Sequence, residues 1–457
     1  MKRRQQIVIS GAGLVGSLLA TLLTQRGYRV TVLEKRPDLR RHAISAGRSI
    51  NLALAERGIH GLRLAGLFDE VARQLIPMRG RMIHEHDGSL EFLSYGQRPH
   101  EVIYSVSRGG LNAILLDALE QDPESKLEFQ SEVVDVDFQR RTVEVQDQVR
   151  DFRRTLAFDY YIAADGGGSL GRRLITTRLG GEDRSELLDH DYKELHLAPG
   201  PTGQFQIERE ALHIWPRGGF MLIALPNLDG SFTVTLFLPK RGERSFEQLQ
   251  TPPAVHQFFR EFFPDATALI PDLVEAFFRN PTGELGTVRC WPWVVPGCAM
   301  LIGDAAHAIV PFHGQGMNAG FEDCAEFIRL LDAAGHDWER TMLEFQRQRK
   351  PNADAIAEMA LENYVIMRDS VRDPQFAVKK ELGFELERRF PDRFIPRYSM
   401  VMFHRIPYQE ALTRGRIQEE ILSELAHGLE DPQGVDLNRA HELVASRLST
   451  LDPAYLA

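Results

Sequence analysis

The chain has 457 residues, of which 54 are Lys or Arg and 64 are Asp or Glu, so its formal net charge is −10 at pH 7. Its hydrophobic fraction of 43% excludes an intrinsically disordered chain and is enough for the cores of roughly one to three domains. The acidic balance and the lack of a sustained Lys/Arg block exclude nucleic acid as the main partner.

The chain contains three cysteines, Cys290, Cys298 and Cys324, and no CxxC pair. This count predicts neither a disulfide framework nor a thiolate metal site. We find no cleavable signal sequence and no apolar run of the roughly 18 residues that a membrane helix needs. The sequence therefore predicts a soluble, cytoplasmic protein without a membrane anchor. A homodimer is compatible with it, although the sequence does not fix the oligomeric state.

Residues 5–34 have the order strand, glycine turn, helix, strand that is typical of a dinucleotide-binding unit. In the turn GAGLVG, Gly11, Gly13 and Gly16 match GxGxxG, whose glycines allow the tight turn, the approach of a pyrophosphate and close helix packing. Glu34 ends the second strand, where a carboxylate holds ribose hydroxyls. This acid argues against NADP at the site and leaves FAD and NAD as alternatives. The next residues, Lys35 and Arg36, either flank the ribose or are solvated.

Two further glycine-containing segments follow strand-like runs. The first, DYYIAADGGGSLGRR, formally contains a second GxGxxG but is better interpreted as a strand followed by Asp-Gly-x-x-Ser-x-x-Arg, which begins at Asp165. The second is the strand CAMLI followed by GDAAH. Asp304 at this strand end is placed to accept from a ribityl hydroxyl. The helix that opens near Gly316 points free N–H groups at the space before it.

Together, GAGLVG with Glu34, the DGxxSxxR segment and GDAAH resemble the three fingerprints of the FAD-dependent aromatic-ring hydroxylases, the single-component flavoprotein monooxygenases. Within that family the chain is most similar to the branch that acts on L-kynurenine. The segments that carry this similarity are 48–55, 80–84, 104–108, 212–216, 311–320, 362–364, 367–370, 398–401 and 405–408. The resemblance runs from residue 5 to about residue 410.

The resemblance implies an oxidoreductase that uses bound FAD, NADPH and O2 to hydroxylate L-kynurenine to 3-hydroxy-L-kynurenine through a flavin hydroperoxide, in tryptophan catabolism or NAD biosynthesis. No catalytic acid or base is assigned, because the oxygen chemistry belongs to the cofactor. The main alternative is a related flavin hydroxylase that acts on a phenolic acid. An NAD-dependent dehydrogenase and a redox-sensing flavin scaffold are weaker alternatives, because each leaves some of the motifs without a purpose.

The implied fold is α/β, with a doubly wound Rossmann-type FAD domain that is interrupted by a β-sheet substrate domain and followed by a helical C-terminal region. We assign residues 1–75, 106–180 and 286–330 to the FAD domain. Residues 76–105 and 181–285 form the expected substrate domain, and residues 331–457 the helical region. Within 199–240, the runs LHIWP, FMLIALP and FTVTLFLP predict consecutive strands.

The family's site residues carry over position by position. Beyond the glycines, Glu34, Lys35 and Arg36, the implied FAD contacts are Val15, Ala53, Arg108, Asp165, Asp304, Gly316, Met317 and Asn318. The implied polar substrate contacts are Arg81, Tyr95, Asn363 and Tyr398, with an apolar wall of Leu212, Met221, Ile223, Leu225, Phe237, Phe312 and His313. No metal is expected, and the pair His84 and His86 is interpreted as strand or turn residues without a metal.

Overall fold

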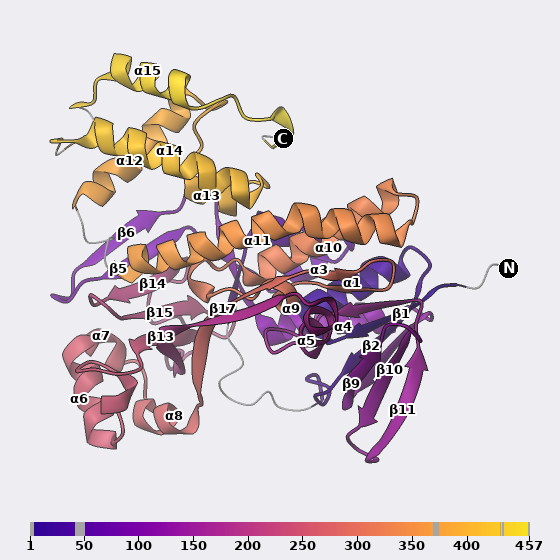
Figure 1. The fold of residues 1–457 in the computed structure, drawn as a ribbon. Helices are drawn as coiled ribbons and strands as arrows, with labels where there is room; N and C mark the ends of the chain where they lie inside the picture. Colours follow the sequence, from indigo (N-terminus) through magenta and orange to yellow (C-terminus); the bar gives the residue numbers. More distant parts are fainter. Residues whose placement is uncertain (1–3, 42–50, 369–373, 430, 432–433, 456–457) are drawn as a thin grey trace. The chain divides into compact units, whose positions relative to one another are not determined.

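The computed structural model describes residues 4–41, 51–368, 374–429, 431 and 434–455 (Figure 1). The motif residues 48–50 and 369–370 lie outside this part of the chain. Two compact units are formed. The first contains residues 1–75, 106–188 and 284–357, and the second contains residues 76–105, 189–283 and 358–457. Searched over the described ranges, the chain has no helix with the length and apolarity needed to cross a membrane.

The first unit is built on a six-stranded sheet in the order β18-β19-β12-β1-β2-β8. All neighbours are parallel except the pair β18 and β19. Its strands are β1 (Gln6–Ser10), β2 (Arg29–Glu34), β8 (Ser125–Phe129), β12 (Tyr160–Ala163), β18 (Val294–Val295) and β19 (Ala299–Leu301). Nearly every residue of β1 and β2 is buried, as expected for parallel strands that are covered on both faces.

The remaining elements of the first unit complete an α/β layer arrangement. A separate antiparallel sheet contains β9 (Ser131–Asp137), β10 (Thr142–Asp147) and β11 (Phe152–Ala157). A short strand, β3 (Asn51–Leu54), precedes α2. The helices are α1 (Leu14–Thr24), α2 (Glu56–Leu64), α3 (Phe68–Ala72), α4 (Arg108–Glu120), α5 (Leu170–Leu179), α9 (Asp304–His307), the 3-10 turn η2 (Pro311–His313) and α10 (Gly316–Ala333). Helix α11 (Trp338–Arg368) begins in this unit and continues into the second.

The second unit is built on a seven-stranded sheet in the order β17-β13-β16-β15-β14-β5-β6. Its strands are β5 (Gly80–His84), β6 (Leu90–Ser94), β13 (Glu182–Leu197), β14 (Ala211–Pro216), β15 (Met221–Pro226), β16 (Phe232–Pro239) and β17 (Thr282–Trp291). Strand β13 begins in the first unit, and most of β17 belongs to the first unit. Strands β14, β15 and β16 confirm the three consecutive strands predicted within 199–240. Strands β4 (Ile76–Met78) and β7 (Ile103–Ser107), which flank β5 and β6 in the sequence, pair antiparallel in a small sheet of order β3-β7-β4.

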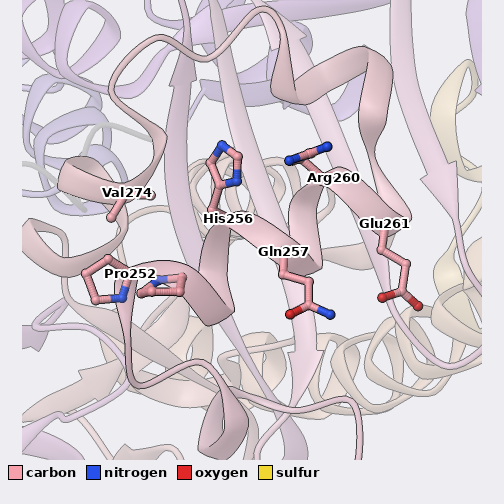
Figure 2. A pocket seen from close by; sticks show the side chains of 7 residues that line it. Pro252, His256, Gln257, Arg260, Glu261 and Val274 are labelled. Carbon is pink, nitrogen blue, oxygen red and sulfur yellow. The ribbon is translucent and has the colours of Figure 1, made fainter.

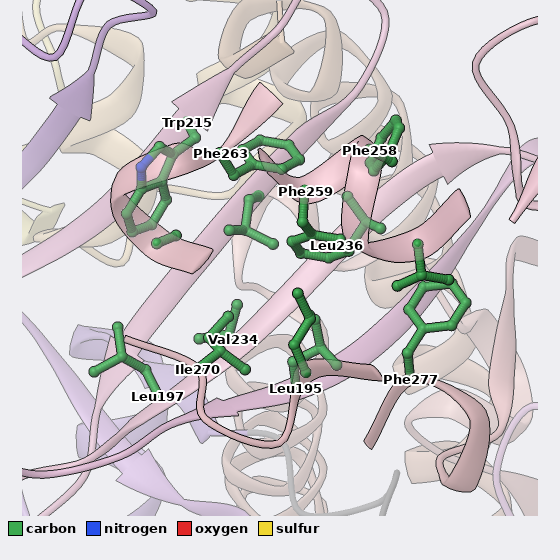
Figure 3. Packing of buried hydrophobic residues seen from close by; sticks show 14 of the residues in the cluster. Leu195, Leu197, Trp215, Val234, Leu236, Phe258, Phe259, Phe263, Ile270 and Phe277 are labelled. Carbon is green, nitrogen blue, oxygen red and sulfur yellow. The ribbon is translucent and has the colours of Figure 1, made fainter. Parts of the chain in front are cut away.

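One face of this sheet is covered by α6 (Pro252–Phe262), α7 (Pro264–Thr267) and α8 (Leu273–Arg279), which follow the turn η1 (Phe246–Gln248). Figure 3 shows Trp215, Val234 and Leu236 from the strands packed against Phe259 and Phe263 of the helical segment. These side chains are almost completely buried. Each fully buried aromatic or aliphatic side chain contributes about 1.5–3 kcal/mol of transfer free energy, so this cluster fixes the sheet from one side.

The C-terminal part is helical, as predicted, with α12 (Pro374–Arg389), α13 (Arg397–Met402), α14 (Tyr408–Ala426), α15 (Leu437–Arg447) and the turn η5 (Pro453–Tyr455). Leu382 and Leu386 of α12 pack with Ile421 of α14 and Leu443 of α15 in a second apolar cluster. The α/β class with a helical C-terminal region is thereby confirmed.

Candidate functional site

The glycine turn of the first unit leaves the start of α1 open. Gly11 has φ +101°, and a Cβ there would lie 2.4 Å from the carbonyl oxygen of Ala164. A Cβ on Gly16 would lie 2.1 Å from the Gly11 carbonyl oxygen, so only glycine allows this close packing. Gly13 is the N-cap of α1, makes no side-chain cap and has no atom within 4 Å of where its Cβ would be. No side chain therefore caps the first N–H groups of α1, which leaves the helix start suited to an anion such as a pyrophosphate.

The carboxylate of Glu34 lies at the end of β2 beside this turn. Its oxygens accept hydrogen bonds from the backbone N–H of Ala12 at 3.0 Å and of Arg36 at 2.9 Å. These bonds fix the direction of the carboxylate and leave lone pairs for further donors. Lys35 and Arg36 are exposed.

The carboxylate of Asp165 accepts hydrogen bonds from its own loop. It accepts from the Ser169 hydroxyl and from the backbone N–H of Leu170 at 2.8 Å, and so caps α5. Arg172 in the first turn of α5 donates to the carbonyls of Gly167 at 2.7 Å and Ala305 at 3.1 Å. The second and third fingerprints are therefore in direct contact, which supports the interpretation of this segment as a loop motif rather than a second dinucleotide turn.

The GDAAH loop is packed against α1 and α10. A Cβ on Gly303 would lie 3.1 Å from Val15, and a Cβ on Gly320 only 2.5 Å from it, so the predicted contact Val15 fits between two glycines. Asp304 is the first residue of α9, and its carboxylate is exposed. No side-chain hydrogen bond of Asp304 is formed within the described residues, so its carboxylate is available to a ligand.

The start of α10 holds two other predicted positions. Asn318 is completely buried. Its Oδ1 accepts from the Ala55 N–H at 2.9 Å, and its Nδ2 donates to the carbonyls of Ala53 and Gly314 at 2.8 Å each. The side chain of Asn318 thus ties α10 to the segment that contains Ala53. Met317 is also buried, whereas Arg108, at the start of α4, is exposed.

Behind the GDAAH loop lies a buried charge network that the sequence did not predict. Asp323 is fully buried and accepts from His307 Nε2 at 2.6 Å, from Arg349 Nε at 2.7 Å and from the Gly303 N–H at 3.1 Å. Glu322 pairs with Arg349 at 2.7 Å and with the completely buried Arg57.

Charge pairing dominates the titration of this network. The pKa of Asp323 is lowered, because the charges of His307 and Arg349 outweigh burial, which alone would raise it. Burial lowers the pKa of His307, but Asp323 raises it more, so the net shift is upward. The only signal in the sequence was two adjacent acids, Glu322 and Asp323, in an apolar helical run.

In the second unit, the predicted wall residues share one face of the sheet. Arg81 of β5 is paired with Leu212 of β14, and Met221 of β15 is paired with Phe237 of β16. Ile223 and Leu225 follow Met221 at intervals of two, and alternate residues of a strand point to the same side. The opposite face carries Trp215, Leu222 and Leu236, which belong to the apolar cluster beneath α6–α8; Figure 3 shows Trp215 and Leu236. This separation places the predicted wall away from α6–α8.

Arg81, on that face, lies beside a stacked pair of tyrosines. The guanidinium carbon is 5.7 Å from the ring centroid of Tyr95 and 5.3 Å from that of Tyr398, and the two rings are stacked at 5.2 Å. Arg81 is 9% exposed, and its buried Nε has no hydrogen-bond partner. Burial raises the pKa of both phenols although the Arg81 charge lowers it, so both remain neutral hydroxyl donors. Strand, strand end and helix thus bring together three of the four predicted polar contacts.

The other predicted substrate residues have different positions. Asn363 is buried in α11, and its Nδ2 donates to the sulfur of Met367 at 3.3 Å. Phe312 and His313 are buried in η2 of the first unit.

The side chains of His84 and His86 lie in different surroundings. His84 ends β5 and is hydrogen-bonded through Nδ1 to Asp265 at 2.8 Å and through Nε2 to His213 at 2.8 Å, whereas His86 lies in the following loop. No group of three metal-ligating side chains occurs among the residues that the structure describes. Burial lowers the pKa of His213 to about 4, so this histidine is neutral near pH 7.

A hollow of about 790 Å³ occurs on the surface of α6 (Figure 2). It is lined by Pro252, Pro253, His256, Gln257, Arg260, Glu261 and Val274. None of these residues is a predicted contact, and α6 covers the face of the sheet opposite to Arg81. FAD fits the first unit, which has an uncapped helix start at α1, the exposed carboxylate of Asp304 and close glycine contacts. The hollow on α6 is lined by none of these features.

Comparison with known proteins agrees with this geometry. Residues 4–360 match the model of the FAD binding domain family. A protein from Myxococcus xanthus named kynurenine 3-monooxygenase is 49% identical over 447 residues, which cover 98% of this chain and 96% of the relative. One of the same name from Xanthomonas axonopodis pv. citri is 46% identical over 452 residues, or 99% of each chain.

Among solved structures, 2-methyl-3-hydroxypyridine-5-carboxylic acid oxygenase aligns with a TM-score of 0.66 at 19% identity, over 81% of this chain and 95% of that one. Pseudomonas aeruginosa PqsL aligns with a TM-score of 0.64 at 21% identity, over 80% of this chain and 97% of that one. These two likenesses establish the fold. With the family match and the near full-length identity, they confirm the resemblance seen in the sequence: the chain belongs to the FAD binding domain family and, within it, to the flavoprotein group that contains the kynurenine 3-monooxygenases.

Proposed function

We propose that this protein is an FAD-dependent monooxygenase that hydroxylates L-kynurenine at ring carbon 3. In the net reaction, one atom of O2 enters the new C–OH group, the other leaves as water, and NADPH is oxidised to NADP⁺. Bound FAD supplies the oxygen activation, and NADPH supplies the electron pair. The near full-length relatives of that name support this assignment.

The observation that carries the substrate assignment is the group of Arg81, Tyr95 and Tyr398. A planar guanidinium holds a carboxylate through two parallel hydrogen bonds, and neutral phenols add donors without adding charge. L-Kynurenine has an α-carboxylate at one end and an aniline ring at the other. Arg81 would therefore fix the amino-acid end, with Asn363 as a further neutral donor.

The apolar face would then receive the ring. Leu212, Met221, Ile223, Leu225 and Phe237 offer hydrocarbon and aromatic surface, from which ordered water is excluded. Exclusion of water matters here because it suppresses the unproductive release of peroxide. Phe312 and His313 are proposed as further wall residues. No residue is assigned as acid or base, since the ring amine of the substrate itself activates the neighbouring carbon.

In the first unit, Gly11, Gly13 and Gly16 would admit the pyrophosphate of FAD, and Glu34 would accept from the adenosine ribose. Asp304 would accept from the ribityl chain. The remaining proposed FAD positions are Val15, Lys35, Arg36, Ala53, Arg108, Asp165, Gly316, Met317 and Asn318.

We also propose that the protein is cytoplasmic and homodimeric, which cell fractionation and light scattering after gel filtration would check.

The proposed function is tested by following NADPH oxidation by the purified yellow protein with and without L-kynurenine, together with product mass and peroxide. Stimulated oxidation with a product heavier by one oxygen atom is expected. Stimulation that yields only peroxide would make L-kynurenine an effector rather than a substrate. Stimulation only by phenolic acids would overturn the assignment.

A further inference from the structure

Helix α12 places a second cation near Arg81. Lys380, Phe384 and Glu387 follow one another at helical spacings of four and three residues, so they lie on one face of α12. That face contacts the loop that follows β6: Gln97 Nε2 donates to the Phe384 carbonyl at 3.1 Å, and the Glu387 carboxylate accepts from Gln97 at 2.7 Å and from Arg98 at 2.9 Å.

The neighbouring hairpin shows which side chains this face meets. Arg81 of β5 is paired with Leu93 of β6, and Glu91 precedes Leu93 by two residues, so all three share one side of the hairpin. The Lys380 ammonium interacts electrostatically with the charges of Arg81 and Glu91. Its Nζ lies 5.8 Å from the ring centroid of Phe384. The Lys380 side chain therefore belongs to the surroundings of the Arg81 cluster.

Neither cation forms an ion pair within the described part of the chain. The adjacent Lys379 behaves differently, because its Nζ pairs with Glu419 at 2.7 Å. Two like charges that are held near each other and largely removed from water are unfavourable, and an anion bound between them offsets that cost. The Nε of Arg81 is buried without a hydrogen-bond partner, so it is available to donate to such an anion.

We propose that Lys380 supplies a second positive charge to the carboxylate site around Arg81, and so makes the pocket select substrates that carry an α-carboxylate. This inference rests on the proposed function and adds a specificity-determining residue to it. Burial and the Arg81 charge lower the pKa of Lys380 to about 8, while Glu91 and Glu381 act in the opposite direction. Lys380 is thus charged at neutral pH but loses its proton in mildly alkaline solution.

The test compares Lys380→Met and Lys380→Arg with Lys379→Met as the matched control on the same helix. The dissociation constants of L-kynurenine and of its decarboxylated analogue are measured from the change in flavin absorbance on binding to the oxidised holoenzyme. Lys380→Met should weaken L-kynurenine binding about tenfold. Binding of the analogue should be the same as in the wild type, since it has no carboxylate. Lys380→Arg should restore tight binding, and Lys379→Met should have no effect.

A pH series supplies a second readout. Wild-type affinity for L-kynurenine should fall as the pH rises through about 8, and Lys380→Arg should remove this fall at Lys380 because arginine stays protonated. Equal weakening of both compounds, or wild-type affinity in Lys380→Met, would overturn the inference and leave the proposed function intact. Absence of any L-kynurenine binding by the wild type would instead refute the proposed function.

Discussion

The buried network behind the GDAAH loop gives the sharpest prediction about stability, through the substitution Asp323→Asn. The change keeps the volume of the side chain but removes its charge. His307 and Arg349 then lose a fully buried anion to which they bond at 2.6 and 2.7 Å. Removing one partner of a buried ion pair costs about 3–5 kcal/mol. Since a domain is stable by only about 5–15 kcal/mol, this loss is a large share of the total.

The assay is guanidinium unfolding of the wild type and of the variant, followed by circular dichroism and by the release of FAD. The matched control is Asp332→Asn, whose salt bridge with Arg26 lies at the surface, where such pairs contribute at most about 1 kcal/mol. An Asp323→Asn protein as stable as the control would refute the view that the network holds the loop.

The same network predicts a pH dependence with a defined sign. The pKa of His307 is raised in the folded protein, so its contribution is present in full below the pKa of an unfolded histidine and is lost as the pH rises through the raised value. The pKa of Asp323 is lowered, so its contribution is lost only in strong acid. Wild-type stability should therefore decline as the pH rises above 6.5, the ordinary pKa of a histidine, and the Asp323→Asn variant should lack that decline.

Four further predictions concern single residues. Arg81→Ala should weaken the binding of L-kynurenine by about 2–5 kcal/mol, because the substrate carboxylate loses a buried charged partner. An unchanged Michaelis constant for L-kynurenine would contradict this. Asp304→Ala should lower the flavin content of the purified protein, as its absorbance spectrum will report. Gly16→Ala should also give flavin-poor protein, since its new methyl group meets the Gly11 carbonyl oxygen; normal FAD loading would show that the turn can relax. Burial raises the pKa of Asp265, but its hydrogen bonds to His84 and Trp215 lower it more, to about 2. Its contribution to stability should therefore persist above about pH 4 and disappear as the pH falls toward 2. Acid unfolding of Asp265→Asn and of the wild type will measure this difference.

The first unit was largely predictable because its signals are local. The turn from Gly11 to Gly16 and the acid at Glu34 lie within one βαβ unit, where spacing along the chain determines spacing in the fold. Likewise, the apolar runs within 199–240 predicted the strands β14, β15 and β16. These features follow from the period of a strand and the needs of a tight turn.

The buried charges were not predictable for the opposite reason. Arg57 and Glu322 are 265 positions apart, and no periodic pattern connects a helix near one end of the chain with α10. Arg81, Tyr95 and Tyr398 likewise come from a strand, a strand end and a helix, so only the family resemblance indicated them. The placement of Lys380 depends on which face of α12 meets the β6 loop, and that is a tertiary contact.

The proposed reaction inserts one atom of O2 into the ring of L-kynurenine. The most direct test is a reaction under oxygen-18 gas with NADPH and L-kynurenine, with the product analysed by mass spectrometry. We expect one oxygen-18 atom in the product, on the ring, and consumption of NADPH equal to the product formed. Product oxygen that comes from water, or NADPH consumed without any hydroxylated product, would contradict it.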